Sequence, residues 1–169
     1  MRRQDHTGAA RALALLRVAA GSVFLIAAAG KVTLYPLIAG IPLPVVSAGW
    51  QRELPARLAS WLSQHPDGLI GAIVRDVLLP HGHFVAGSIA WLQLLAGLLL
   101  VIGLFTRTAA LVAGIIALAL ALAASSRSGV DARPYLLLLA MSVAFILGRA
   151  GDVFGLDSVR DERRRFRDL

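Results

Sequence analysis

Hydrophobic residues along the chain gather into four long blocks that are almost free of charge. A transmembrane helix needs about 20 apolar residues, with a range of roughly 17 to 25. The blocks therefore predict four spanning helices, at residues 12–32, 84–105, 108–125 and 133–149. The last block is short, but Arg133 and Arg149 flank it and can extend their guanidinium groups to the lipid head groups. Apart from residues at the block ends, Arg17 is the one internal charge, and it lies near enough to an end to do the same.

Residues 35–83 form the one long segment between predicted spans, and they hold six of the seven prolines. Apolar residues recur at helical spacing in two parts of this segment, and each part predicts a short amphipathic helix. The first part contains Leu54, Leu58, Trp61 and Leu62, and the second contains Leu69, Ile70, Ile73, Val74, Val77 and Leu78. Asp67 is the expected cap of the second helix, and Pro80 ends it. Two placements stay open: the membrane interface, which we favour, or a lid over the mouth of the bundle.

The composition supports a membrane protein. Hydrophobic residues make up 57% of the chain and charged residues 16%, with a mean hydropathy of +0.73, whereas soluble domains average about 25% charged residues. We therefore predict an all-α fold, in which residues 1–169 form a single integral membrane domain built as a four-helix bundle. The segment 35–83 is external and carries the short helices, and a basic tail follows at 150–169. A cleaved signal peptide is the alternative for the first block, and Arg17 inside it argues against cleavage.

The distribution of basic residues predicts the orientation in the membrane. Cytoplasmic segments of membrane proteins carry an excess of Lys and Arg. The side that holds both termini carries the larger set, namely Arg2, Arg3, Arg11, Arg107, Arg149, Arg160, Arg163, Arg164, Arg165 and Arg167. The other side carries Lys31, Arg52, Arg57, Arg75, Arg127 and Arg133. Both termini are therefore expected in the cytoplasm, and the net charge of +7 is expected to meet anionic lipids rather than nucleic acid.

Thr106 and Arg107 are the only polar residues between the second and third predicted spans, so we interpret them as a hairpin turn. Arg107 then lies at the start of a helix, where the macrodipole is positive and a cation is mildly unfavourable. The positive-inside bias explains its position, and this is the interpretation we favour. The alternative is a lipid phosphate or another anion held between its guanidinium group and the helix N-terminus.

Several kinds of chemistry find no support in the sequence. The chain has no cysteine, which excludes disulfides, thiolate nucleophiles and Cys metal sites. Its four histidines include the pair His81 and His83, but a metal site needs three or four ligands, so no metal is predicted. No histidine lies inside a span to bind haem axially. No phosphate loop, nucleophile elbow or paired intramembrane carboxylate is present either.

Polar residues within or at the ends of the spans are the best candidates for function. They are Arg17, Lys31 and Gln93. Arg17 and Lys31 are separated by about 21 Å along one helix and do not meet, whereas Lys31 and Gln93 are expected at similar depth. One interpretation is interhelical hydrogen bonding, and the other is a polar pocket for a small ligand such as a quinone carbonyl. Glycines at Gly21, Gly30, Gly97 and Gly103 favour close helix contact under either interpretation.

Two stretches resemble a known family. "LLRVAAGSVFLIAAAGK" (15–31) and "LQLLAGLLLVIGLFTRTAAL" (92–111) are similar to the two signatures of the DoxX/DoxD family of bacterial four-helix membrane proteins. The long segment after the first span is more like the DoxD branch, the small subunit of thiosulfate:quinone oxidoreductase. The resemblance makes Arg17, Lys31 and Arg107 signature residues. Where the family usually has an intramembrane glutamate, this chain has Gln93, so a proton-carrying carboxylate is absent there.

The resemblance implies a function without deciding whether the chain is itself catalytic. The first hypothesis is a membrane subunit of a quinone-linked respiratory oxidoreductase in the bacterial cytoplasmic (inner) membrane, with a quinone as cofactor. The alternative is a non-catalytic membrane organiser that anchors a soluble redox-defence partner through its basic tail. Either hypothesis implies membrane lipids and another protein subunit as partners. A transporter is weaker, because the spans lack a carboxylate for coupling.

Overall fold

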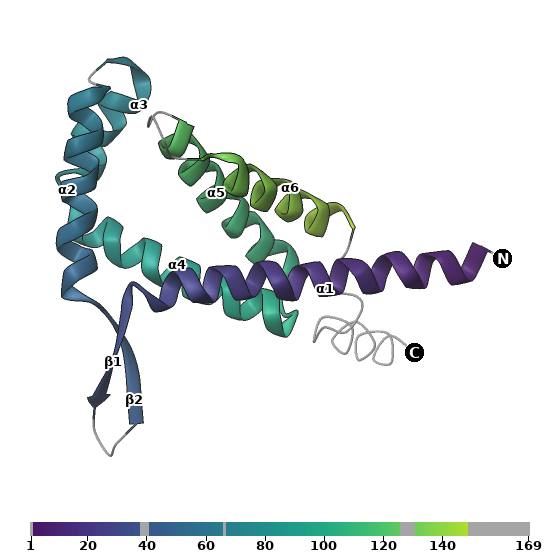
Figure 1. Cartoon of the computed structure of the whole chain (residues 1–169). Coiled ribbons are helices and arrows are strands. Elements are labelled where there is room, and N and C mark those ends of the chain that lie inside the picture. The colour runs from purple at the N-terminus through teal and green to yellow at the C-terminus, as the bar shows by residue number, and fades with distance from the viewer. Residues whose placement is uncertain (1, 38–40, 66, 126–130, 149–169) are drawn as a thin grey trace, which may run out of the picture. The chain divides into compact units, whose positions relative to one another are not determined.

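The computed structural model describes residues 2–37, 41–65, 67–125 and 131–148, so the predicted tail at 150–169 lies outside the described residues. Figure 1 shows a mostly helical chain. Its elements are α1 (Arg2–Ala29), β1 (Val32–Leu37), β2 (Ile41–Val46), α2 (Ala48–Gln64), α3 (Gly68–Ile73), the π-helical turn η1 (Val74–Leu78), α4 (Gly82–Ile102), α5 (Thr106–Ser125) and α6 (Arg133–Leu147).

The hairpin of β1 and β2 departs from the all-α prediction. The strands are antiparallel, with Val32 opposite Val46 and Pro36 opposite Pro42. Proline lacks a backbone N–H and is confined to edge strands, and in a two-stranded sheet both strands are edges. Pro36 and Pro42 are therefore compatible with this hairpin.

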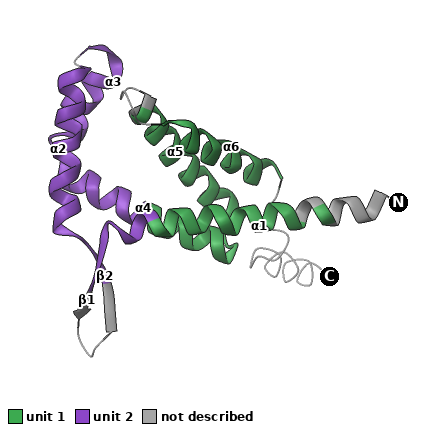
Figure 2. Ribbon diagram, viewed as in Figure 1, with its two compact units in different colours: residues 1–26, 93–169 green, residues 27–92 purple. Residues whose placement is uncertain are grey.

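The described chain divides into two compact units (Figure 2). The first comprises residues 1–26 and 93–169, and the second comprises residues 27–92. α1 and α4 each contribute residues to both units, whereas the hairpin, α2, α3 and η1 belong wholly to the second.

The interior of the first unit is built largely from small residues. Its core cluster consists of Ala20, Phe24, Leu100, Ala109, Ala110, Ala113, Ile116 and Phe145. Large aliphatic side chains lie outside instead, with Leu15 73% and Leu147 78% exposed. Soluble proteins bury their large aliphatic residues, whereas helices that pack within lipid place small residues at their contacts. The surface of this unit is therefore suited to hydrocarbon.

α1 and α4 approach each other closely at Gly21 and Gly97. A Cβ atom on Gly97 would lie 2.9 Å from the carbonyl oxygen of Gly21 and 3.0 Å from the backbone nitrogen of Leu25. A Cβ atom on Gly21 would lie 2.9 Å from the carbonyl oxygen of Gly97. Backbone meets backbone at this crossing, so the close contact expected at these two glycines is confirmed.

Two of the described helices are long and apolar enough to cross a membrane, over Arg11–Ala29 and Gly82–Ile102. The apolar stretches of α5 and α6, Thr106–Leu122 and Arg133–Leu147, are shorter. The structure thus contains a helix for each predicted span, and a bundle in which all four cross the bilayer remains a prediction.

The second unit contains the two helices predicted between the spans. Ser47 begins α2, and its hydroxyl oxygen accepts a hydrogen bond of 3.2 Å from the backbone N–H of Trp50. Leu54 is the buried residue of α2. Asp67 occupies the cap position of α3 as expected, but its side chain makes no capping hydrogen bond.

Candidate functional site

α4 ends in a glycine cap that sets the turn into α5. Gly103 has φ 72°, and the backbone N–H groups of Gly103 and Leu104 both donate to the carbonyl of Leu99, at 2.8 and 3.1 Å. A left-handed residue at this position with a bond back to the last helical turn is the usual glycine ending of an α-helix. Phe105 also has positive φ, 49°, and α5 begins at Thr106.

The predicted position of the hairpin turn was therefore wrong by three residues. The chain reverses at residues 103–105, and Thr106 and Arg107 form the first turn of α5. The conformational freedom of Gly103 decides the position, because glycine enters the left-handed region without steric cost. Arg107 is exposed in that first turn. Its predicted contact with a lipid or anion remains a prediction.

Arg17 is buried against this turn. A Cβ atom on Gly103 would lie 2.6 to 2.7 Å from three atoms of the Arg17 guanidinium group. The Arg17 side chain is 1% exposed, so it does not extend to the surface as we expected from its place near a block end. The guanidinium group instead lies beside the C-terminal end of α4, where the helix macrodipole favours a cation.

Among the described residues of the first unit, three other polar side chains are buried, those of Gln93, Thr106 and Ser142. The Ser142 hydroxyl donates to the carbonyl of Leu138 in its own helix, at 2.8 Å. The Gln93 side chain is 3% exposed, and its Oε1 atom accepts no hydrogen bond from the described residues. Gln93 thus carries a buried acceptor oxygen without a hydrogen-bond donor among the described residues. Thr106 was predicted only as part of a hairpin turn. Ser142 was not selected from the sequence, although its hydroxyl lies inside an apolar block.

Lys31 lies two residues beyond α1, in the second unit. Its ammonium group donates to the carbonyl of Ala27, at 2.6 Å, and lies 5.0 Å from the centroid of the Trp50 ring. The Trp50 Nε1–H donates in turn to the carbonyl of Ala86, at 2.9 Å. Lys31 and Trp50 therefore link the end of α1, the start of α2 and the beginning of α4.

The predicted contact between Lys31 and Gln93 is not tested by the structure of either unit, because the two residues belong to different units. Their contact remains a prediction. Within its own unit, Lys31 has partners supplied by the chain itself. The role of Trp50 was not foreseen, and the serine three residues before it was the one local signal of a helix start there.

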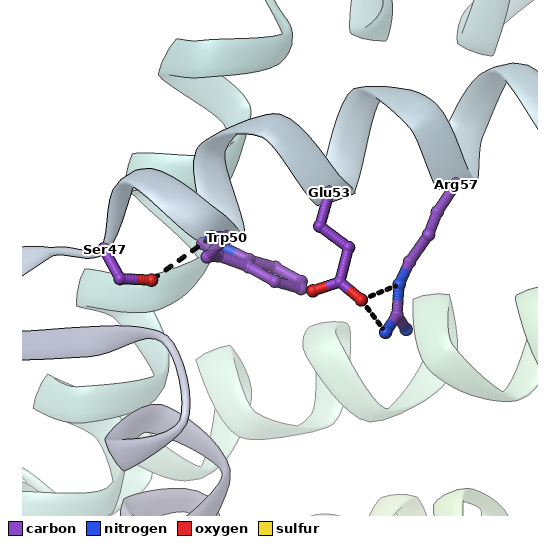
Figure 3. A network of polar contacts seen from close by, with 4 residues as sticks. All are labelled: Ser47, Trp50, Glu53 and Arg57. Carbon is purple, nitrogen blue, oxygen red and sulfur yellow. Dashed lines mark hydrogen bonds and ion pairs between the residues drawn. The ribbon is translucent and has the colours of Figure 1, made fainter.

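A charged pair follows Trp50 along α2. Figure 3 shows Ser47, Trp50, Glu53 and Arg57 in succession, with the guanidinium group of Arg57 on the carboxylate of Glu53. The Arg57 Nε–H donates to Glu53 Oε1 at 3.1 Å.

Partial burial lowers the pKa of Lys31 below its ordinary 10.5, and the positive charge of Arg57 lowers it further.

This shift predicts a pH dependence of stability. In the interval between the lowered pKa of folded Lys31 and 10.5, the unfolded chain binds more protons than the folded chain, so the free energy of unfolding rises with pH. Chemical unfolding in detergent at a series of pH values up to 10.5 measures the slope. Lys31→Met is expected to remove this contribution and Arg57→Gln to reduce it. An unchanged slope in Lys31→Met would contradict the assignment.

Over the described ranges, no three His, Asp or Glu side chains lie together in a way that would hold a metal ion. Three polar features of the described chain involve residues selected from the sequence: the Arg17–Gly103 contact, the Gln93 amide and the Lys31–Trp50 link. They belong to the two stretches 15–31 and 92–111 and to the start of α2.

Comparison with protein families gives one match. The DoxX family model matches residues 12–126, more than half of the chain. Comparisons with curated proteins and with solved structures gave no match. The matched region includes both resembling stretches, together with Arg17, Lys31, Gln93 and Arg107. The chain belongs to the DoxX family, a family of membrane proteins.

Proposed function

We propose that this protein is the integral membrane subunit of a quinone-linked oxidoreductase of the thiosulfate:quinone type, and that Gln93 contacts the quinone head group. The observation that carries the proposal is the Gln93 amide, which is buried and has an acceptor oxygen without a partner among the described residues. A buried polar group without a hydrogen bond costs free energy. A quinol hydroxyl that donates to Oε1 would remove this cost.

A glutamine amide is suited to both redox states of a quinone. Its N–H group donates to a quinone carbonyl, and its oxygen accepts from a quinol hydroxyl. The amide does not titrate, so Gln93 binds the head group and leaves proton transfer to other groups or to water. The usual glutamate of the family is replaced here, which separates binding from proton transfer at this position.

The proposed arrangement in the membrane places α1, α4, α5 and α6 across the bacterial cytoplasmic membrane, with both termini in the cytoplasm. The large aliphatic residues exposed on these helices support a lipid-facing surface. The excess of arginine on the side of the termini supports the orientation. A second subunit that oxidises the sulfur substrate would supply the electrons.

Replacement of Gln93 tests the proposal. Gln93→Leu is expected to lower the quinone that co-purifies in mild detergent by about five- to tenfold, the equivalent of a hydrogen bond of about 1 kcal/mol. Thermal stability should barely change, because polar contacts within membranes contribute about 0.6 kcal/mol on average. Quinone per mole of protein is measured after extraction.

Ser142→Ala is the matched control, since Ser142 is equally buried but its hydroxyl bonds within its own helix. This variant should retain the quinone content of the natural protein. Equal quinone in Gln93→Leu and the natural protein, or none in either, would refute the proposal. The non-catalytic organiser that anchors a redox-defence partner through its arginine-rich tail would then be the better interpretation, and a soluble enzyme recovered with the protein would support it.

A further inference from the structure

α3 and η1 form one continuous helical segment, Gly68–Leu78, with three chemically different sides. Figures 1 and 2 show it at the end of α2 remote from the hairpin, within the second unit. One side is buried: Gly71 and Val74 are covered, and η1 packs on α2. Burial of these residues stabilises the packing of the segment against α2.

A second side is apolar and exposed. It consists of Leu69, Ile70, Ile73 and Val77, of which Leu69 is 78% and Val77 53% exposed. Leu69, Ile73 and Val77 recur every four residues, a spacing that keeps side chains on one side of a helix. Arg75 and Asp76 are also exposed and carry the charges of the third side.

The chain holds this segment near the membrane. η1 ends at Leu78 and α4, one of the two helices long and apolar enough to cross a bilayer, begins at Gly82. Four residues span at most about 14 Å. Phe84, in the first turn of α4, is itself 76% exposed. The exposed apolar side is therefore confined to the level at which a membrane-spanning helix enters the bilayer.

We propose that the segment Gly68–Leu78 lies in the membrane interface, with Leu69, Ile70, Ile73 and Val77 inserted among the lipid acyl chains and Asp76 in water. Amphipathic helices of this kind bind at the boundary between head groups and acyl chains. Within the second unit this apolar side stays exposed beside the start of α4, which leaves it available to lipid. The inference is independent of quinone binding.

Site-directed spin labelling tests the inference directly, because the chain has no cysteine to remove. Single variants Ile70→Cys, Val77→Cys and Asp76→Cys carry a nitroxide in the full-length protein, reconstituted in vesicles of phosphatidylcholine and phosphatidylglycerol. Collision rates are measured with molecular oxygen, which is enriched in lipid, and with a water-soluble nickel chelate. Leu95→Cys, on the exposed side of α4, is the lipid reference.

The ratio of oxygen to nickel collision rates at Ile70 and Val77 is expected to be several-fold higher than at Asp76 and to approach the ratio at Leu95. Equal ratios at all three segment positions would place the apolar side in water and overturn the inference. Low access to both reagents at Ile70 and Val77 would also overturn it, since a protein surface would then cover them. Asp76 is adjacent to Val77 in the chain, so the comparison does not depend on the overall depth of the segment.

Discussion

Gly97→Leu is expected to be the most destabilising single substitution in the first unit. The first atom of any side chain at this position would lie 2.9 Å from the carbonyl oxygen of Gly21 and 3.0 Å from the backbone nitrogen of Leu25. Neither atom can move without a shift of α1. Overpacking usually costs about 1 to 3 kcal/mol, and occasionally more. Because backbone atoms are in the way here, we expect at least the upper end of that range.

Gly87→Leu is the matched control, because Gly87 lies in the same helix and a Cβ atom added to it would meet nothing within 4 Å. Unfolding of both variants is followed by denaturant titration in detergent. Gly87→Leu should be close to neutral, while Gly97→Leu should lose most of its cooperative transition or fail to yield folded protein. Similar stabilities of the two variants would show that α1 and α4 do not meet at Gly97.

Gly103→Ala is expected to have the second largest effect, through two separate costs. The left-handed conformation, φ 72°, disfavours alanine by about 1 to 2 kcal/mol. The new methyl group would also lie 2.6 to 2.7 Å from the guanidinium group of Arg17. A flexible arginine would normally move aside, but this side chain is almost fully buried and has little space for another rotamer.

Gly68→Ala separates these two costs. Gly68 also has positive φ, 92°, but nothing lies within 4 Å of an added Cβ atom, so only the backbone cost applies there. We expect Gly103→Ala to lose about 2 kcal/mol more free energy of unfolding than Gly68→Ala, within the range of couplings between contacting residues. In an Arg17→Met background the excess should shrink. An equal loss in both glycine variants would refute the contact between Arg17 and the turn.

The helices were predictable because each apolar block is long and uncharged enough to favour lipid over water as its surroundings. Blocks of about 20 residues without charge can satisfy their backbone groups in lipid only as helices, and this property is readable residue by residue. The short helices of the second unit were predictable for a similar reason, since the spacing of Leu54, Leu58 and Trp61 is a local property. The resemblance to the DoxX family likewise depended on short contiguous stretches, and the family match includes both of them.

The burial of Arg17 could not be predicted from the residues near it in the sequence. Its short distance from the end of the apolar block suggested a surface position. The sequence does not show which helix lies beside Arg17, so its burial could not be predicted. The structure places its guanidinium group against Gly103, 86 residues away, at the negative end of α4. The hairpin of residues 32–46 was missed for a related reason, since its prolines are acceptable only on edge strands, and edges exist only once the pairing is known.

The sequence by itself determined the helical segments, their suitability for a membrane and the family, because all three depend on the composition and order of neighbouring residues. Only the tertiary structure decided which polar residues acquire partners. Lys31 is paired with Ala27 and Trp50, and Arg17 lies at the α4 terminus, while the Gln93 oxygen accepts nothing from the described chain. The physical reason is that burial and hydrogen bonding depend on which helices pack together. That packing depends on contacts between residues far apart in the sequence, such as Gly21 with Gly97.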